Sequence, residues 1–377
     1  MNEIINKIVG FIKKETVLTV AWVLAIISAF IITPSISYVN YIDFRSLGIL
    51  WCLMIVMAGL KERGFFKYIG NALLKKTSKV WQLCLVLILL CFFLSMFITN
   101  DVALITFVPF SIFVLNECKR ENLLIPTIVL QTLAANLGSM LTPIGNPQNL
   151  YLYGLAGMSL GEFVGIMLPY SALTLVLLLI SILFIDGRSE KIACENLEAI
   201  VYEKKDKSIC IAYGILFIGA LLVVLRFVPY WAIMILVLVV VFIMDRKILL
   251  SIDYALLFTF IGFFIFTGNL GNIEAVKNVL TEAINGHEVI MGVGASQIIS
   301  NVPAALLLSP FTDNYRSLII GVNLGGMGTL IASMASLISF KALAHNYNHL
   351  KGRYFALFTV VNIVYLCVLM GMWMIIS

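Results

Sequence analysis

Charged side chains are scarce in this chain. Only 12% of its 377 residues are Asp, Glu, Lys or Arg, whereas 61% are hydrophobic and the mean hydropathy is +1.04. Soluble domains carry about a quarter of charged residues, so the composition excludes an ordinary soluble protein. Apolar stretches of about 20 residues recur along the chain, which is the length that a helix needs to cross the hydrocarbon core of a bilayer. We therefore predict an all-α, polytopic membrane protein.

The sequence also lacks the motifs of metal, redox and nucleotide chemistry. Its three histidines do not cluster, and none of its seven cysteines forms a C-x-x-C pair. It contains no H-E-x-x-H and no G-x-x-x-x-G-K-[ST] nucleotide loop. These absences disfavour an intramembrane enzyme and a chain that itself hydrolyses ATP, and they leave a separate ATPase subunit open. We therefore expect no cofactor. We also expect no nucleic-acid partner, because the basic residues that give the net charge of +5 lie in loops.

Two segments, one in each half of the chain, resemble each other. Residues 98–110 and 299–311 share Ile, Asn, Ala, Pro and Phe at matching positions without a gap, and a hydroxyl residue precedes each Asn. A second pair follows, because residues 136–144 and 323–331 are identical at six of nine positions. Both pairs are polar or glycine-rich interruptions of apolar sequence. In a membrane protein, duplicated interruptions at matching places predict a substrate site between two repeats.

Each half of the chain follows the same predicted plan, a re-entrant hairpin and then a span that is broken in its middle. The predicted units are a first repeat (1–185, with hairpin 80–116 and broken span 123–157), a cytoplasmic linker (186–208), and a second repeat (209–377, with hairpin 288–312 and broken span 316–344). Full spans are expected at 17–36, 43–60, 161–185, 209–228, 230–244, 251–270 and 352–376.

The basic residues predict the orientation. If neither hairpin makes a net crossing, 21 of the 25 Lys and Arg residues fall on the side that holds the N-terminus. The positive-inside rule then places the N-terminus in the cytoplasm and the chain in the plasma membrane, surrounded by lipid. An odd number of crossings separates the two copies, so we expect the second copy to be inserted upside down, as an inverted-topology repeat.

The interruptions place polar groups inside the bilayer, where the hydrocarbon of the lipid cannot form hydrogen bonds. A helix breaks inside a bilayer only where protein or a polar cavity surrounds the break. Helix N-termini attract anions, whereas carbonyl and side-chain oxygens suit Na⁺. Asn100 and Asn301 could simply cap helices. Because the repeat relates them and each precedes an Asn/Gly/Thr break, we interpret both as parts of a binding site.

Asp101 is the one acidic residue at the predicted hairpin tips, and its counterpart in the second copy is Val302. A carboxylate deep in a bilayer costs about 2.5–3.5 kcal/mol unless it is paired or protonated, and it usually marks function. No Lys or Arg lies nearby in the sequence. We expect Asp101 to bind the coupling cation, as a proton carrier or a Na⁺ ligand. The alternative is an acid that the dipole of its own helix stabilises.

Three motifs stand at these interruptions, namely Asn100-Asp101-Val102-Ala103, the loop TPIGNPQN at 142–149, and Ser300-Asn301. With them, the chain resembles the ion transporter superfamily over about residues 40–345. This superfamily includes arsenite permeases, citrate and dicarboxylate transporters and sodium/proton antiporters of the arsenite-pump type, and the nearest group is its bacterial anion permeases. The resemblance implies a homodimer in which a transport domain moves as an elevator against a scaffold.

The resemblance also bears on the ligand. In dicarboxylate members each hairpin tip carries Ser-Asn-Thr, which binds substrate carboxylates and frames Na⁺ sites. Here both Asn are kept and both Thr are lost, whereas Asp101 is more similar to the arsenite and antiporter branches. The candidate substrate-binding residues are Thr99, Asn100, Asn146, Ser300, Asn301 and Thr329. The candidate cation-binding residues are Asn100, Asp101, Gly138, Thr142, Gly145, Asn301 and Gly325.

Residues and resemblance together predict a cation-coupled secondary transporter for a small anion, either a carboxylate or an oxyanion. The coupling ion is Na⁺ or H⁺, and no other metal is expected. An arsenite-type efflux permease or a sodium/proton antiporter is the alternative. The two readings differ in whether a carboxylate stimulates Na⁺ or H⁺ movement.

Overall fold

The computed structural model describes residues 10, 15–75, 77–192 and 204–376. Within these residues every regular element is a helix, apart from one isolated bridge. Eight helices of the described chain are long and apolar enough to cross a membrane. The prediction of an all-α, polytopic membrane protein is confirmed.

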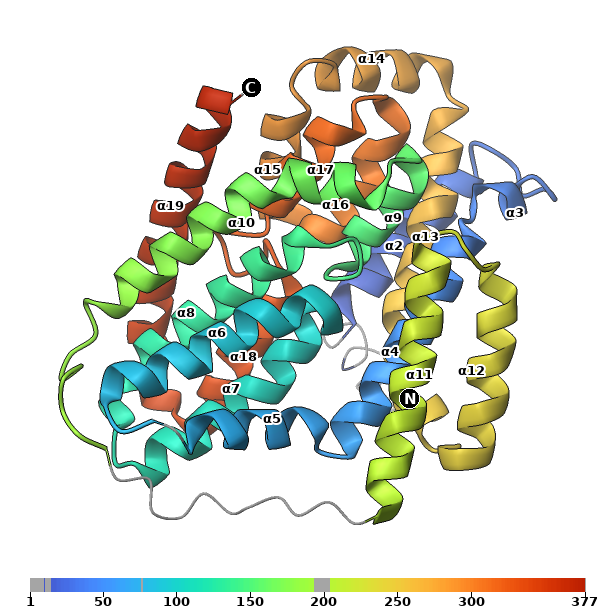
Figure 1. Cartoon of the computed structure of the whole chain (residues 1–377). Coiled ribbons are helices and arrows are strands. Elements are labelled where there is room, and N and C mark those ends of the chain that lie inside the picture. The colour runs from blue at the N-terminus through green and yellow to red at the C-terminus, as the bar shows by residue number, and fades with distance from the viewer. Residues whose placement is uncertain (1–9, 11–14, 76, 193–203, 377) are drawn as a thin grey trace.

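The helices follow one another as labelled in Figure 1. The first half of the chain contains α2 (Thr16–Ala29), α3 (Tyr38–Tyr41), α4 (Phe44–Glu62), α5 (Phe65–Leu74), α6 (Val80–Ile98), α7 (Asn100–Glu117), η1 (Glu121–Leu123), α8 (Leu124–Gly138), η2 (Ser139–Leu141), α9 (Pro147–Ala156) and α10 (Leu160–Ile182). The second half contains α11 (Lys204–Val224), α12 (Tyr230–Asp245), η3 (Ile248–Leu250), α13 (Tyr254–Gly271), α14 (Glu274–Ile284), α15 (Glu288–Ile299), α16 (Asn301–Leu308), η4 (Ser309–Phe311), α17 (Tyr315–Leu324), α18 (Met334–Asn346), η5 (Asn348–Leu350) and α19 (Lys351–Ile376).

The first apolar span is shorter than the sequence indicated. We expected a helix over 17–36, but α2 ends at Ala29 after 14 residues. Pro34 follows in the next turn, and a proline disfavours helical backbone in the residue before it. A helix of this length falls short of a full crossing. α2 instead packs along α13.

In each predicted hairpin, the start of the first arm and the end of the second arm lie at the same end of the molecule. The backbone N–H of Val80, where α6 starts, donates to the carbonyl of Glu190 (3.1 Å), and Arg120, just after α7, forms an ion pair with the Glu190 carboxylate (2.5 Å). In the second copy, the hydroxyl of Thr312 donates to the carboxylate of Glu288 (3.1 Å), where α15 starts. The chain therefore turns back on itself at Thr99 and again at Ser300.

The basic segments that the charge count places on one side of the membrane contact one another. Arg63, which follows α4, forms ion pairs with Asp206 at the start of α11 (3.2 Å) and with Asp245 at the end of α12 (2.5 Å). The hydrogen bond to Asp245, more than any other contact, raises the pKa of the Arg63 guanidinium. Tyr347 donates to the side chain of Asn116 (2.8 Å) and so joins a further pair of these segments.

The amphipathic helices of the two halves lie at opposite ends of the molecule. Figure 1 shows α5 along the lower end and α14 across the upper end. Each of them comes directly before a hairpin, α5 before α6 and α14 before α15. The helices that precede the two hairpins therefore lie at opposite ends of the molecule, and the inverted-topology repeat stays a prediction.

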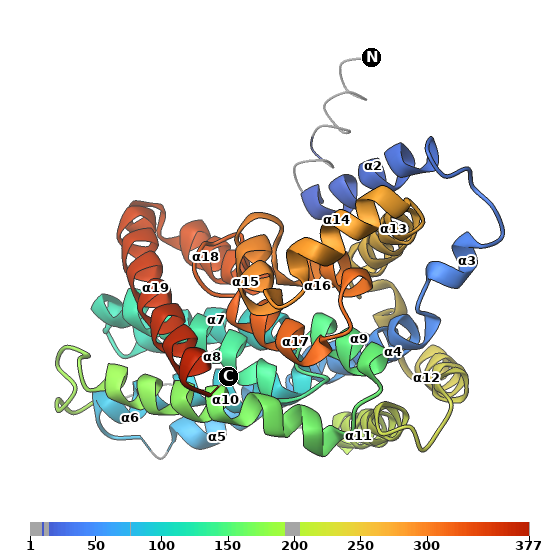
Figure 2. The same cartoon turned by 90° about the horizontal axis from the view of Figure 1, so that it is seen from above.

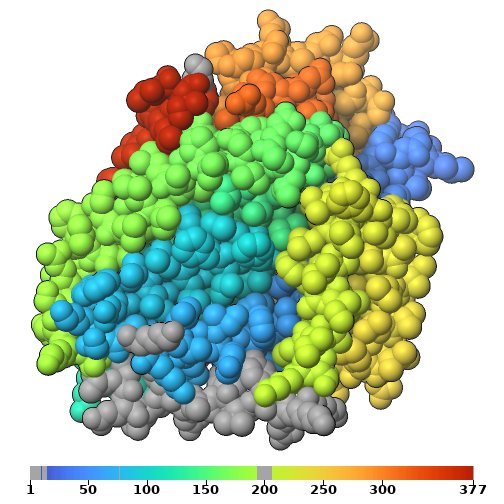
Figure 3. All heavy atoms as spheres, in the orientation of Figure 1, coloured from blue at the N-terminus to red at the C-terminus, as the bar shows by residue number. Residues whose placement is uncertain are grey.

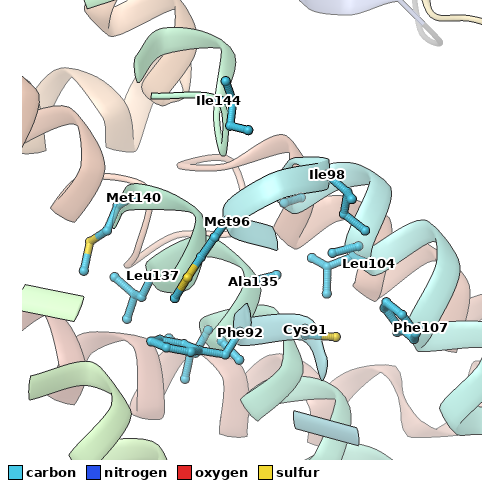
Figure 4. Close-up of a cluster of buried hydrophobic side chains, with 14 of the residues drawn as sticks. Cys91, Phe92, Met96, Ile98, Leu104, Phe107, Ala135, Leu137, Met140 and Ile144 are labelled. Carbon is cyan, nitrogen blue, oxygen red and sulfur yellow. The ribbon is translucent and has the colours of Figure 1, made fainter. Parts of the chain in front are cut away.

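The most buried helix is α8, at the centre of the first half. Fourteen of its fifteen residues are buried, which is typical of a helix enclosed by protein on all sides. It packs closely against α6, and Figure 4 shows Phe92 and Met96 of α6 beside Leu137 of α8. Met140 follows α8 in the same cluster. This core supports the loop that comes after α8.

The helices α9, α16 and α17, which belong to the broken spans and to a hairpin, are enclosed by other helices. In Figure 2, α9, α16 and α17 lie together in the middle of the molecule, between α13 and α10, and α9 contacts both α16 and α17. In the space-filling view of Figure 3, side chains of α6, α10, α11 and α12 cover the visible face. The broken elements of both halves therefore meet in the interior.

Candidate functional site

The two hairpin tips have the same strained backbone. Thr99 has φ 69° and ψ 152°, and Ser300 has φ 73° and ψ 155°. Side chains other than glycine rarely adopt positive φ, and a β-branched residue such as threonine does so at a real cost. Each tip is held by the loop of its own half, because Asn100 N–H donates to the Gly145 carbonyl (3.2 Å) and Asn301 N–H to the Ala332 carbonyl (3.0 Å).

The side chains of the two tip asparagines accept hydrogen bonds from the backbone of their own helices. The Asn100 Oδ1 accepts from the backbone N–H of Asp101 (2.9 Å), and the Asn301 Oδ1 accepts from that of Val302 (3.0 Å). Each amide oxygen thus satisfies one free donor at the start of a helix. Both residues are also buried, at 4% and 5% exposure. The N-cap positions themselves belong to Thr99 and Ser300, so the asparagines are the first residues of α7 and α16.

Asn136 joins the first half of the molecule to the second. It is the last asparagine of α8, and its Oδ1 accepts from Asn100 Nδ2 (3.0 Å) and from the Ser333 hydroxyl (3.0 Å). Its Nδ2 donates to the Ser336 hydroxyl (3.3 Å). The hairpin of one half and the broken span of the other therefore share one buried amide.

Asn323, the repeat counterpart of Asn136, also joins the two halves, this time from the second half to the first. Asn323 of α17 donates to the Oδ1 of Asn149 in α9 (2.7 Å). In the sequence alignment of the two copies, Asn323 matches Asn136 and Asn149 matches Ser336. The two broken spans consequently face each other through equivalent hydrogen bonds in both directions.

The paired threonines of the two loops hold their loops in place. The Thr142 hydroxyl donates to the Met96 carbonyl of α6, and the Thr329 hydroxyl donates to the Gln297 carbonyl of α15 (3.2 Å). Met96 and Gln297 are themselves at matching positions of the two copies. Both threonines were candidate ligands, and the structure gives each of their hydroxyl protons a partner in the protein.

The candidate glycines lie where elements approach closely. A Cβ at Gly138 would lie 2.2 Å from the Phe92 carbonyl oxygen, and one at Gly145 would lie 2.0 Å from the Ser139 carbonyl oxygen. A Cβ at Gly325 would lie 2.6 Å from the Ser296 hydroxyl. Gly138 and Gly325 thus allow the ends of α8 and α17 to pack against α6 and α15, and Gly145 allows its loop to fold back on η2.

A cavity of about 200 Å³ lies where the tips and broken spans meet. Its walls come from α2, α7, α9, α13, α16 and α18, so both halves of the molecule contribute. Of the candidate site residues, Asn100, Asp101, Asn146 and Asn301 line it. The other candidates, which do not line it, are Thr99, Gly138, Thr142, Gly145, Ser300, Gly325 and Thr329. The two tip asparagines, far apart in the sequence, thus lie at one cavity.

Four buried polar atoms without a hydrogen-bond partner in the described protein belong to residues that line this cavity. Within the described residues they include Asp101 Oδ1, Asn146 Oδ1, and both the oxygen and the nitrogen of the Gln148 amide. A buried polar group left without a partner costs about 1–3 kcal/mol. Such a cluster is typical of a surface that binds a polar ligand.

The orientation of the Asn146 amide follows from its neighbours. The Ser139 hydroxyl donates its one proton to the Asn136 carbonyl (2.9 Å), so it can only accept from Asn146. Asn146 Nδ2 donates to it (2.7 Å), which leaves the Asn146 oxygen free. An acceptor therefore faces the cavity region at this position.

Acidic and basic side chains both line the cavity in the part of the chain that the structure describes. The lining includes three carboxylates, of Glu15, Asp101 and Asp253, and one ammonium group, of Lys341. Lys341 is not near Asp101 along the chain, because more than half of the chain's length separates the two residues. Only the fold brings α18 to the first hairpin, against which it packs.

Sequence reasoning missed most lining residues, among them the polar side chains of Gln148, Ser333 and Lys341. Gln148 is part of the quoted loop motif, but it was not assigned a role. Ser333 is the repeat counterpart of Asn146, and extending the alignment by two residues would have found it. Lys341 carries no sequence signal that separates it from the other loop-proximal lysines.

Comparisons with known proteins agree with this architecture. The family model described as "Citrate transporter" matches residues 4–316. An uncharacterized transporter of Methanocaldococcus jannaschii is 33% identical over 333 residues, which cover 88% of this chain and 90% of that protein. The inner membrane protein YbiR of Escherichia coli is 31% identical over 307 residues, which cover 80% of each. The human P protein is 30% identical over 36% of this chain and 17% of its own length.

Proposed function

This chain belongs to the citrate transporter family and is a membrane permease, and from that premise we propose that it is a cation-coupled secondary transporter of a small anion, either a carboxylate or an oxyanion. One observation carries the proposal. Asn100 and Asn301, the repeat-related residues of the two hairpin tips, line one cavity together with Asn146 and Ser333 of the two broken spans. Unwound backbone that faces a polar cavity is the arrangement that secondary transporters use for their substrates.

The charges of the cavity support coupling to a cation. The described acids Asp101 and Asp253 disfavour the entry of an anion unless H⁺ or Na⁺ accompanies it. Asp101 lies at the first hairpin tip, and its Oδ1 is buried without a protein partner. Binding of H⁺ or Na⁺ at Asp101 would remove a charge from the cavity before the anion enters. In this proposal the coupling ion is a condition for substrate binding.

The proposed state faces the cytoplasm. Asp253, at the start of α13, lines the cavity and follows Asp245 closely in the chain, while Asp245 pairs with Arg63 at the basic end of the molecule. Lys341 also lines the cavity and belongs to a segment counted on the basic side. With the basic end in the cytoplasm, the cavity opens inward.

We further propose an elevator-type movement in a homodimer. α11 and α12 pack on α4 and, in Figure 1, stand apart from the bundle of α6, α7 and α8. This separation supports a scaffold that contains α4, α11 and α12. The strained hairpins and broken spans would then move against it as one body.

An ion-flux assay with Asp101→Asn tests the proposal. In proteoliposomes, we expect carboxylates or oxyanions to stimulate H⁺ or Na⁺ movement through the wild-type protein. Asp101→Asn should abolish that stimulation and leave the amount of inserted protein unchanged. Asp313→Asn removes an exposed carboxylate outside the cavity and serves as the matched control. Full coupled flux in Asp101→Asn would refute the role of Asp101.

The alternative, a sodium/proton antiporter or an arsenite-type efflux permease, is favoured by one observation. Three of the four unpartnered polar atoms at the cavity are acceptors, which suit a cation or a hydroxylated neutral solute better than a bare anion. An antiporter would exchange Na⁺ for H⁺ with no anion present. The flux assay without added anion therefore separates the two functions.

A further inference from the structure

Gln148 is a buried amide with no hydrogen-bond partner in the described protein. It is 0% exposed and lies in the first turn of α9, directly after Pro147. Neither its Oε1 nor its Nε2 has a partner, and Gln148 lines the cavity. In the described chain it is the one buried amide for which both atoms are unpartnered. A site that binds a ligand accounts for this, because a purely structural amide would have at least one bond.

Two other buried amides of the molecule show the contrast. Asn149, the next residue, accepts from Asn323 (2.7 Å), and Gln131 of α8 donates to the Leu87 carbonyl (3.0 Å) and to the Ser111 hydroxyl (2.8 Å). Each of these amides connects two helices. Gln148 connects none, so the network that holds the broken spans together does not use it.

The free atoms of Gln148 define the group that would bind there. A primary amide presents an acceptor and a donor side by side. Its complement is a group that gives one hydrogen bond and takes another, such as a carboxylate beside a hydroxyl, or a protonated carboxyl. The free oxygen of Asn146 at the same cavity adds an acceptor, which again favours an O–H group on the ligand.

We propose that Gln148 binds the transported acid directly and selects acids that carry an O–H group, by accepting from that O–H and donating to a neighbouring carboxyl oxygen. This inference rests on the proposed function and adds to it a specificity residue and a requirement on the substrate. The O–H is either a hydroxyl or the proton of a carboxylic acid. The two sources differ in their dependence on pH.

The test is ligand-induced thermal stabilisation of the purified full-length protein. The probes are two matched pairs, malate with succinate and citrate with propane-1,2,3-tricarboxylate, where each second member lacks only the hydroxyl. We expect the hydroxylated member of at least one pair to stabilise the wild type at neutral pH, since a ligand of the folded state raises its stability with occupancy. Stabilisation by succinate or the tricarboxylate only at about pH 4.5, where carboxyls gain protons, would assign the O–H to a carboxyl.

Gln148→Leu separates a binding role from a structural one. Without ligand, we expect its melting temperature to equal or exceed that of the wild type, because the substitution removes two unpaired buried polar atoms. The affinity for the stabilising acid should fall about tenfold or more. Asn362→Leu, in a buried amide of α19 away from the cavity, should leave that affinity unchanged.

Two sets of outcomes overturn the inference. One is a Gln148→Leu protein that is less stable without ligand and binds the acid as the wild type does. The other is a wild type that no O–H-bearing probe stabilises at either pH. If anions without an O–H still drive Na⁺ or H⁺ flux in that case, the proposed transport function stands and only the role of Gln148 falls. Loss of all anion-stimulated flux would instead remove the transport function.

Discussion

At the scale of single residues, the centre of this molecule depends on asparagine. An amide side chain both donates and accepts, so one residue can join several elements where no water is at hand. Asn136 does so with three side-chain partners, Asn100, Ser333 and Ser336. Two of the three belong to the other half of the chain. The same residue type thus supports both the connection between the halves and the polar character of the cavity.

Asn136→Ala should destabilise the protein by about 1–3 kcal/mol, because it leaves the buried Asn100 amide without its acceptor. The thermal melting of purified protein in detergent measures this. Asn362→Ala is the matched control, since Asn362 is equally buried but bonds only to the Phe358 carbonyl of its own helix (2.8 Å). If the control lowers the melting temperature as much as Asn136→Ala does, the connection between the halves contributes nothing specific.

At the scale of elements, the two halves repeat their backbone geometry as well as their sequence. The tips at Thr99 and Ser300 have φ values of 69° and 73°. The N-caps of α4 and α13, Asp43 and Asp253, have φ of −80° and −79° with ψ of 84° in both. Close packing of a glycine against a neighbouring helix is a further shared device, at Gly138 and Gly325. The hairpins and loops are therefore built in the same way twice.

Gly138→Ala should disturb the contact between α8 and α6. The new Cβ would lie 2.2 Å from the backbone oxygen of Phe92, which can move only if α6 moves. We expect a melting temperature lower by several degrees, equivalent to about 1–3 kcal/mol of overpacking, and reduced transport.

Gly165→Ala is the control for this prediction, because nothing lies within 4 Å of a Cβ at that position of α10. Alanine there should be neutral or slightly stabilising. Equal melting temperatures for the two variants would contradict the close contact of α8 with α6.

At the scale of the whole molecule, ion pairs and hydrogen bonds gather the basic segments at one end. Arg63 contacts Asp206 and Asp245, and Arg120 contacts Glu190, so these contacts connect four separate parts of the chain. α14 lies at the opposite end in Figure 1. The charge count places these basic segments in the cytoplasm and α14 outside, and this orientation stays a prediction.

Labelling from the two sides of the membrane tests this orientation. In a cysteine-free background of intact cells, Lys277→Cys in α14 should react with a membrane-impermeant maleimide, because α14 would face the outside. Glu121→Cys, after the first hairpin, should react only in inside-out vesicles. Reaction of both cysteines from the same side would refute the inverted arrangement of the two hairpins.

Much of this architecture could be predicted from the sequence, because its causes are local or periodic. Scarcity of charge and apolar runs dictate membrane helices, and the paired interruptions mark where Thr99 and Ser300 turn the chain. The predicted end of the first span was wrong. Apolar residues up to position 36 favoured a longer helix, whereas α2 ends at Ala29, before Pro34. That the substrate site includes Asn100 and Asn301 stays a prediction, now with both residues at one cavity.

The sequence by itself determined the class of protein, the number of copies of the motif and the places where helices break, since each depends on neighbours along the chain. Only the tertiary structure decided which polar atoms remain unpaired. Lys341 lines the cavity. Asn149 accepts a hydrogen bond from Asn323, whereas the neighbouring Gln148 amide has no partner in the described protein. These outcomes depend on contacts between helices that are distant in sequence, and no local pattern records them.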